Sequence, residues 1–308
     1  MRKQEVTHTL LLVLAAFLWG ITFAFQSMGA EYVGPFTYLA LRSYLAVIFL
    51  IPVIAVADRI RVKKGLEDGK PKNEAQKKEY FLGGISCGVV LMGASVLQQA
   101  GIAYTTTAKT SFITALYVVI VPILSFLMGR KQEKKIWFCM VLSIIGLYFL
   151  CFSNGLEGIA SGDVIVLLCA FAYAVQILIV AHFVPHIDGI RLCQMQMFWT
   201  AILSTFIMVL VEKPTMEAIA RAGVSIAFAG IVSSGIAYTL QIVGQEGLNP
   251  SVASLAMCLE SVFGALGGWV ILGEKMAPKE IFGACLMFAA IVLSQISLPK
   301  KEQVENVG

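Results

Sequence analysis

The sequence Leu97-Gln98-Gln99-Ala100-Gly101 matches Leu240-Gln241-Ile242-Val243-Gly244 at a shift of 143 residues, and the same shift still pairs Ser111 with Ser254. Each match is short, but matches that keep their order along the chain indicate an internal repeat. We therefore predict that the chain consists of two similar halves. Two further pairs of stretches support this division: Met128-Gly129-Arg130-Lys131 with Leu272-Gly273-Glu274-Lys275, and Ala16-Phe17-Leu18-Trp19 with Ala170-Phe171-Ala172-Tyr173.

The composition indicates a membrane protein. Hydrophobic residues make up 58% of the 308 residues, and charged residues only 14%. An ordinary soluble domain has about 25% charged residues, because its surface must be covered by groups that water solvates. A chain in a lipid bilayer has an apolar exterior, so this composition fits it.

The chain contains ten apolar segments long enough to cross the hydrocarbon core, which takes roughly 20 helical residues. Only helices and closed barrels satisfy all backbone polar groups in lipid, and continuous apolar runs favour helices. The predicted fold is therefore all-α and integral to the membrane, with ten transmembrane helices. The polar stretch Asp58–Glu79 is expected to be the longest loop. The segments cover residues 8–27, 36–57, 80–103, 108–128, 135–152, 161–184, 192–211, 223–244, 251–272 and 278–297.

Each half of the chain holds five segments, the first half over residues 8–152 and the second over residues 161–297, with polar Asn154–Gly162 at the junction. An odd number of crossings places the second half upside down relative to the first. Inverted repeats are characteristic of secondary transporters, in which the substrate binds near the middle of the membrane, between the repeats.

Lysine and arginine residues are distributed unevenly between the two sides. If the N-terminus lies inside, cytoplasmic segments hold 17 of them, against Lys213, Arg221, Lys275 and Lys279 on the opposite side. Positive residues prefer the cytoplasmic side, so we expect both termini in the cytoplasm and a location in the plasma membrane, specifically a bacterial inner membrane. The net charge of +4 reflects this topology and does not predict nucleic-acid binding, because the positive residues are spread over several loops.

No residue pattern predicts an enzyme, a metal site or a cofactor. The seven cysteines form no CxxC pair, and the three histidines lie at or near segment ends. No nucleotide-binding motif is present. Gly84-Ile85-Ser86-Cys87-Gly88 matches the GxSxG pattern of hydrolases, but that pattern requires a strand-to-helix turn. In a membrane segment, glycines four residues apart favour close helix packing instead.

Several motifs resemble those of one known family. They are Leu18-Trp19-Gly20-Ile21-Thr22-Phe23, Ala115-Leu116-Tyr117-Val118-Val119-Ile120-Val121-Pro122 and Ile271-Leu272-Gly273-Glu274-Lys275. Together they resemble the EamA-type branch of the drug/metabolite transporter (DMT) superfamily, over about residues 8 to 297. The first copy departs from the pattern, because Gly129-Arg130 stands where the second copy has Gly273-Glu274. The resemblance implies two EamA repeats, a central cavity, alternating access, and substrates that range over amino acids, other metabolites and toxic compounds.

Glu260 is the outstanding candidate for a functional residue. It lies roughly ten residues into the ninth segment, about 15 Å deep at 1.5 Å per residue. A charge at that depth is costly and usually faces a cavity or a partner. The repeat alignment sets Glu260 opposite Tyr117, and we expect both to contact the substrate. Glu260 then binds a cationic group or carries a coupling proton; the alternative is a carboxyl that only bonds neighbouring helices.

Three further residues are candidates for contact or gating. Arg42 lies about two turns inside the second segment, where it attracts an anionic group of the substrate or extends outward along the helix. Lys109 opens the fourth segment, and it either guards the outer mouth or anchors the helix at the interface. Pro122 can bend the same segment, which serves gating or simple packing.

Polar and aromatic side chains are predicted to line the cavity. In the eighth segment Ser234, Tyr238, Gln241 and Gln245 are spaced by four, three and four residues, so they share one helix face. The alternative for the amides is hydrogen bonding between helices. The predicted substrate contacts also include Trp19, Gln98, Gln99, Tyr173 and Gln176.

The predicted function is secondary transport of a small metabolite, amino acid or drug-like amphipathic solute by alternating access, with export favoured by family analogy. The expected partners are this solute, the lipid bilayer, a coupled proton and a second copy of the chain in a homodimer. Two alternatives remain, a non-transporting membrane sensor or assembly protein and an intramembrane enzyme. A sealed bundle without a polar cavity would favour the sensor.

Overall fold

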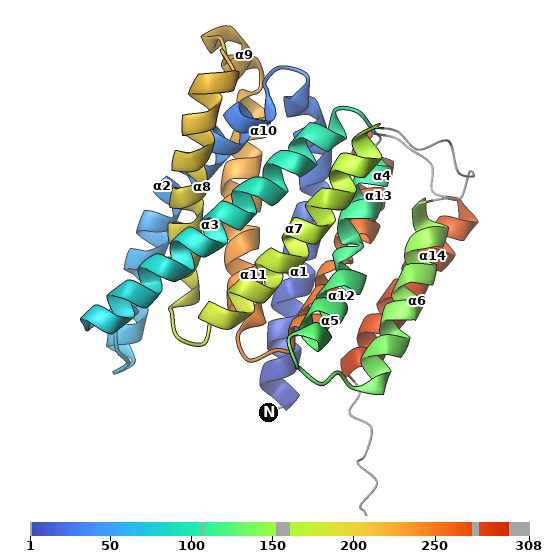
Figure 1. Cartoon of the computed structure of the whole chain (residues 1–308), viewed down its shortest axis with the longest axis horizontal. Helices are drawn as coiled ribbons and strands as arrows, with labels where there is room; N and C mark the ends of the chain where they lie inside the picture. Colours follow the sequence, from blue (N-terminus) through green and yellow to red (C-terminus); the bar gives the residue numbers. More distant parts are fainter. Residues whose placement is uncertain (1, 106, 152–160, 273–276, 296–308) are drawn as a thin grey trace, which may run out of the picture.

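A computed structural model of the chain describes residues 2–105, 107–151, 161–272 and 277–295. All regular structure in these residues is helical, and the helices form one elongated bundle (Figure 1). The helices of the first half are α1 (Arg2–Ala30), α2 (Pro35–Lys63), α3 (Glu74–Ile102), α4 (Thr107–Ala115), α5 (Tyr117–Leu127) and α6 (Lys134–Cys151). Those of the second half are α7 (Ser161–Phe183), α8 (Gly189–Val211), α9 (Met216–Arg221), α10 (Gly223–Phe228), η1 (Ala229–Ala237), α11 (Tyr238–Gln245), α12 (Pro250–Met257), α13 (Glu260–Leu272) and α14 (Pro278–Gln295).

Within the described residues, all ten predicted segments lie on helices, and residues 152, 296 and 297 of two segments lie outside the described part of the chain. In the described residues, eight helical stretches are long and apolar enough to cross a membrane. Three of them, Thr110–Leu127, Gly223–Gln245 and Pro250–Gly267, run through consecutive helices. The other two predicted segments lie in α6 and α14, which have 18 residues each. The chain is therefore a multi-pass membrane protein.

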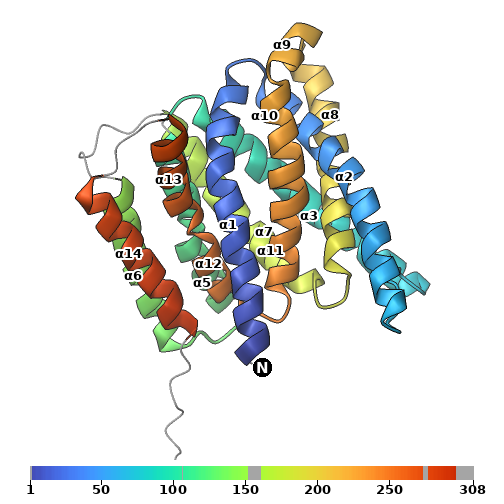
Figure 2. The ribbon, with the colours of Figure 1, turned by 180° about the vertical axis from the view of Figure 1, so that it is seen from behind.

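The two halves pack in the same pattern. Helix α3 of the first half lies against α7, and its equivalents in the second half, η1 and α11, lie against α1. In the same way α4 and α5 contact α7, and their equivalents α12 and α13 contact α1. Two equivalent pairs contact each other directly, α2 with α8 and α6 with α14, at opposite edges of the bundle (Figures 1 and 2). Exchange of the two halves leaves this pattern unchanged, so an approximate two-fold axis relates them.

Helices α2 and α8 run in opposite directions, as contacts at both ends demonstrate. At one end the Glu212 carboxylate, just after α8, accepts hydrogen bonds from the backbone N–H groups of Phe36 (2.9 Å) and Thr37 (2.8 Å) at the start of α2. At the other end Arg61 of α2 pairs with Asp188, the N-cap of α8, at 2.5 Å. The equivalent helices α1 and α7 also start at opposite ends of the bundle (Figure 1).

Two helices of the bundle are interrupted at equivalent positions. The break between α4 and α5 lies at Leu116, and the break between α12 and α13 lies at Cys258 and Leu259. Tight i to i+3 hydrogen bonds bridge both breaks, from Val119 N to Leu116 O (2.9 Å) and from Ser261 N to Cys258 O (3.2 Å). The backbone stays hydrogen-bonded there, as a membrane interior requires.

The predicted boundaries of the loop Asp58–Glu79 are both wrong, because the loop in the structure is shorter at each end. Helix α2 continues to Lys63, and α3 already begins at Glu74. Charged residues do not stop a helix, so both helices extend beyond their apolar segments. The Asn73 side chain caps α3 by accepting a hydrogen bond from Gln76 N at 2.8 Å.

The GxSxG stretch forms a helix contact, as predicted for glycines at this spacing. Gly88 lies against α8, where an added Cβ atom would be 2.6 Å from Trp199 Cβ and 2.9 Å from the Gln196 carbonyl oxygen. A side chain of any size would therefore push α3 and α8 apart. The serine of this stretch, Ser86, lies in the middle of helix α3 and on no strand-to-helix turn.

Candidate substrate-binding cavity

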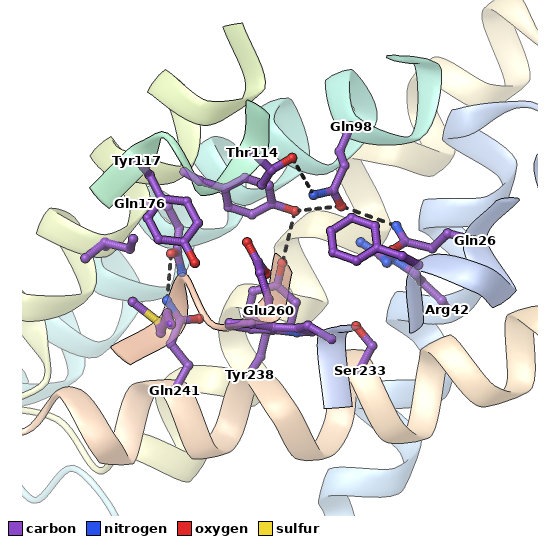
Figure 3. Close-up of a pocket in the computed structure, with 15 residues that line it drawn as sticks. Gln26, Arg42, Gln98, Thr114, Tyr117, Gln176, Ser233, Tyr238, Gln241 and Glu260 are labelled. Atoms are coloured by element: carbon purple, nitrogen blue, oxygen red, sulfur yellow. Dashed lines mark hydrogen bonds between the residues drawn. The ribbon is translucent and has the colours of Figure 1, made fainter. Parts of the chain in front are cut away.

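One cavity lies in the middle of the bundle, between the two halves (Figure 3). The interrupted or irregular helices of the described residues, α4–α5, η1–α11 and α12–α13, all contribute to its walls, together with α1, α2, α3 and α7. About 30 Å³ of it is open to the centre of a water molecule, which is room for about two waters. A solute must therefore displace side chains to enter. The lining residues are Trp19, Phe23, Gln26, Arg42, Gln98, Thr114, Tyr117, Tyr173, Gln176, Ile177, Ser233, Tyr238, Gln241, Met257 and Glu260.

A pair of tyrosines from the second half lies at the centre of the wall. The Tyr238 hydroxyl donates to the Tyr173 hydroxyl at 3.2 Å, and Tyr173 in turn donates to Gln98 Oε1 at 3.4 Å. The Trp19 ring meets the Tyr238 ring edge to face, with centroids 4.9 Å apart. Aromatic groups from both halves thus form an apolar surface with hydroxyl groups at its edge.

One amide cluster comes from the first half. Gln26 Nε2 donates to Gln98 Oε1 (3.3 Å) and to Gln99 Oε1 (3.2 Å), and Gln98 Nε2 donates to Thr114 Oγ1 (3.3 Å). Gln99 also donates to the Gln26 carbonyl oxygen at 3.0 Å. Gln99 is buried by these bonds and is absent from the cavity lining.

A second amide cluster comes from the second half. Gln241 Nε2 donates to Gln176 Oε1 at 3.0 Å, and Gln176 Nε2 donates to Gln196 Oε1 at 3.4 Å. Gln245, one turn after Gln241, is buried and donates to the Ile177 carbonyl oxygen at 3.1 Å. Of these amides, only Gln176 and Gln241 reach the cavity.

The π-helix η1 changes which serine of the eighth segment faces the cavity. A regular α-helix aligns Ser234 with Tyr238, four residues later. In a π-helix the bonds run over five residues, and Tyr238 N indeed bonds the Ser233 carbonyl oxygen. Ser233 therefore lines the cavity, while Ser234 is buried outside it.

Two charged side chains of opposite sign reach the cavity. Arg42 of α2 is 3% exposed and Glu260, the first residue of α13, is 5% exposed. Neither forms an ion pair with any described residue, and Arg42 Nε and Glu260 Oε1 are buried without a hydrogen-bond partner. The Tyr117 hydroxyl is buried beside the Glu260 carboxyl and interacts with it. One nitrogen of Arg42 and one oxygen of Glu260 thus remain without a hydrogen-bond partner within the described residues.

All the residues predicted to line the cavity or contact the substrate do line the cavity, except Gln99, Ser234 and Gln245. Pro122 is buried inside α5 and outside the lining, and the side chain of Lys109 lies outside the described part of the structure. Sequence reasoning missed some lining residues, although Gln26 and Thr114 are polar positions within apolar segments, which is a usable signal. The missed residues are Phe23, Gln26, Thr114, Ile177, Ser233 and Met257.

The described residues contain no group of three or more histidine, cysteine, aspartate or glutamate side chains that could hold a metal ion. The cavity lining contains no histidine, cysteine or lysine, so its chemistry consists of one carboxyl, one guanidinium, amides, hydroxyls and aromatic rings. Such an arrangement suits recognition of a solute by charge and shape.

The fold and the cavity define a multi-pass membrane protein with a two-fold bundle around a central polar site. A family model described as the EamA-like transporter family matches residues 7–152 and 160–295. The chain belongs to this family and is a membrane transporter, which the motifs of the two halves predicted.

Relatives agree with this assignment. An "Uncharacterized transporter" of Archaeoglobus fulgidus is 26% identical over 283 residues, which cover 92% of this chain and 83% of the relative. The "Uncharacterized transporter YoaV" of Bacillus subtilis is 21% identical and covers 94% of this chain and 97% of its own. A solved protein crystal structure has the same fold, with a TM-score of 0.72 at 18% identity, covering 94% of this chain and 96% of that one.

Proposed function

We propose that the protein is a secondary transporter with ten transmembrane helices that moves a small amphipathic solute by alternating access. The observation that carries this proposal is the position of the cavity. It lies between two inverted halves, and both halves supply its aromatic, amide and charged side chains. Substrate sites of secondary transporters lie at such repeat interfaces.

The interrupted helices provide a means of opening. The breaks at Leu116 and at Cys258–Leu259 directly precede the cavity residues Tyr117 and Glu260. Backbone changes at a few such positions allow the two parts of a helix to tilt separately. We propose that tilting of these helices exposes the cavity first to one side and then to the other.

The orientation follows from the position of the charged ends. The N-terminal end of α1 and the C-terminal end of α14 lie at the same end of the bundle (Figures 1 and 2). The Arg59–Lys78 region and Arg191 also lie there, as the Arg61–Asp188 pair joins them. By the positive-inside preference, we propose that this end faces the cytoplasm of a bacterial cell, and that transport runs outward.

The energy source is a gradient of the solute or of an ion, because the sequence contains no nucleotide-binding motif. Glu260 is the cavity carboxyl that a coupling proton would use. A charged carboxylate in a low-dielectric interior is costly unless a cation accompanies it, and both a proton and a cationic solute group meet that need.

Solute flux into proteoliposomes tests the proposal. Purified protein is reconstituted and supplied with labelled amino acids and cationic drugs, with and without a pH gradient. We expect protein-dependent flux of at least one solute, with protein-free liposomes as the control. Absence of flux for every solute under every gradient would favour a membrane sensor with a sealed cavity instead.

A further inference from the structure

A groove on the surface of the bundle is separate from the central cavity. It has a volume of about 500 Å³, and it lies between α3, α5 and α7. Leu124 and Leu127 of α5 form one of its walls, and Phe171 and Val175 of α7 form another. Within the described residues, the groove and the cavity share no lining residue. The groove is therefore a second candidate binding site.

The length of the groove matches one leaflet of a bilayer. Its lining on α7 extends from Phe171 to His182, a distance of about 16 Å along the helix axis at 1.5 Å per residue. This length is close to half of the hydrocarbon core, which is ~30 Å thick. Phe171 is 52% exposed and Leu127 is 73% exposed, and such side chains on the surface of a membrane protein face the lipid. One acyl chain therefore fits along the groove.

A positive charge lies at one end of the groove. Gly129 follows α5 with a left-handed backbone (φ 81°), and Arg130 N then donates to the Ser125 carbonyl oxygen at 3.0 Å. Such a turn is a common end of a helix, and here Arg130 lines the groove together with His182. The Arg130 side chain is exposed and forms no ion pair within the described residues. It is therefore available to an anionic group.

Two contacts place this turn at the end of the bundle where α1 begins. Gln132, two residues after Arg130, accepts a hydrogen bond from Ser251 Oγ at 3.0 Å. Five residues before Ser251, the Glu246 carbonyl oxygen lies 2.5 Å from His8 Nδ1 of α1. Figure 1 shows the end of α5 near the start of α1. This end is the one proposed to face the cytoplasm, where anionic phospholipids attract arginine and lysine side chains.

The equivalent helices of the second half pack closely instead. In the repeat alignment Gly267 of α13 takes the place of Leu124 of α5. A Cβ atom added to Gly267 would lie 3.7 Å from the Ile21 Cα atom of α1, so the two backbones are in contact. The charge also changes sign, because Glu274 stands where the first half has Arg130. Two departures from the repeat thus coincide, a groove and a positive charge at its end.

We propose that the groove binds one anionic phospholipid of the cytoplasmic leaflet. Its phosphate group lies on Arg130 and His182, and one acyl chain extends along Phe171 and Val175. A guanidinium can donate two parallel hydrogen bonds to a phosphate, and an imidazole N–H can donate one. An anionic headgroup is favoured over phosphatidylethanolamine, whose ammonium group offsets the charge of the phosphate. The site depends on the proposed orientation in the membrane and is independent of transport.

Native mass spectrometry of the full chain in detergent tests the proposal. The protein is titrated with dioleoylphosphatidylglycerol or with dioleoylphosphatidylethanolamine, which carry the same acyl chains and differ in the headgroup. The fraction of protein that holds one lipid gives the affinity for each. We expect phosphatidylglycerol to bind about fivefold more tightly, which is the contribution of one arginine beside an anionic lipid.

Variants of Arg130 test the headgroup contact. Arg130→Gln should weaken phosphatidylglycerol binding about fivefold and remove the preference between the two lipids. Arg130→Lys keeps the charge and should retain most of the preference. Arg59→Gln is the matched control, because Arg59 is exposed near the end of α2 and lies outside the groove. Size-exclusion chromatography checks that each variant remains folded.

A bulky substitution tests the contact with the acyl chain. Val175→Trp should weaken the binding of both lipids, because the indole ring occupies space in the groove that the chain needs. Val209→Trp is the matched control, because Val209 lies on α8, is 67% exposed and lines no part of the groove. It should bind both lipids as the parent protein does.

Three results would overturn the proposal. Equal affinity for the two lipids, or equal loss in Arg130→Gln and Arg59→Gln, would show that Arg130 selects no headgroup. Unchanged lipid binding in Val175→Trp would show attraction of a headgroup to the protein surface without a seat for the chain. A protein dimer that excludes phosphatidylglycerol would assign the groove to a second copy of the chain.

Discussion

Tyr117 and Glu260 occupy equivalent places in the two halves of the molecule. Each is the first residue after the break in an interrupted helix, and each lines the central cavity. The two residues that we propose contact the substrate therefore lie beside the breaks in their helices. A ligand that holds both side chains will constrain both breaks, so binding and opening are physically coupled in this arrangement.

Replacement of Glu260 by Gln should strongly impair transport. The substitution keeps the shape of the side chain and removes its charge, so the contact to a cationic group is lost. We expect kcat/KM for the best solute to fall about 10-fold to 100-fold, as for loss of a charged hydrogen bond. Flux in proteoliposomes is the measurement, with Glu246→Gln as the control. Equal rates for both variants would show that Glu260 has no part in transport.

Arg42→Lys should also impair transport, although the charge is kept. Lysine cannot donate two parallel hydrogen bonds from a fixed plane, and it lacks the planar guanidinium that lies 5.9 Å from the centre of the Tyr38 ring. We expect an approximately tenfold higher KM for a solute with an anionic group. Arg130→Lys, at an exposed position, should behave as the parent protein. A KM that is unchanged in Arg42→Lys would exclude direct contact by the guanidinium.

Gly88→Ala should destabilise the protein. Its Cβ atom would meet Trp199 Cβ at 2.6 Å, so α3 and α8 must separate, at a cost of about 1–3 kcal/mol. Gly93→Ala in the same helix is the control, because no atom lies within 4 Å of that Cβ position. We expect a lower midpoint of thermal unfolding in detergent only for Gly88→Ala. Similar midpoints would contradict the close contact between α3 and α8.

Asp58→Asn should weaken the link between α2 and α8 at the charged end of the bundle. Asp58 pairs with Arg191, and the two side chains are only 18% and 13% exposed. Loss of the partner leaves a poorly solvated arginine, which we expect to lower the free energy of unfolding by about 1–3 kcal/mol. Glu74→Gln removes an equivalent charge from the exposed pair with Lys77 and should have no measurable effect. Unfolding in mixed micelles compares the two.

Thiol labelling of intact bacterial cells checks the orientation. We expect Lys213→Cys, which follows α8, to react with a membrane-impermeant maleimide. Lys70→Cys, between α2 and α3, should react only after the cells are made permeable. Because Cys285 is exposed in the parent chain, the labelling of each variant is compared with that of the parent chain. The reverse pattern would place the termini outside the cell.

The membrane class, the repeat and most of the cavity could be predicted from the sequence. Buried charge in a bilayer is so costly that Glu260 and Arg42 stand out in an apolar chain, and the repeat alignment pairs Glu260 with Tyr117. These signals depend on composition and order along the chain, which a sequence shows directly.

The local backbone departures could not be predicted. Nothing in the sequence around Leu116 or Ala229–Ala237 distinguishes a break or a π-helix from a regular helix, because both depend on packing against other helices. Because of the π-helix, Ser233 lines the cavity in place of the predicted Ser234. Gln99 was predicted as a contact and lies instead in bonds with Gln26, since a helix face does not specify which of two adjacent amides is bonded internally.

Solute counterflow tests the central claim most directly. Proteoliposomes are loaded with an excess of the unlabelled solute, and the initial uptake of the labelled solute is measured for the parent protein, Glu260→Gln and Glu246→Gln. Alternating access through the cavity predicts that loading accelerates uptake in the parent and in Glu246→Gln, and that the acceleration disappears in Glu260→Gln. Uptake that is insensitive to loading, or equally accelerated in all three proteins, would contradict the account.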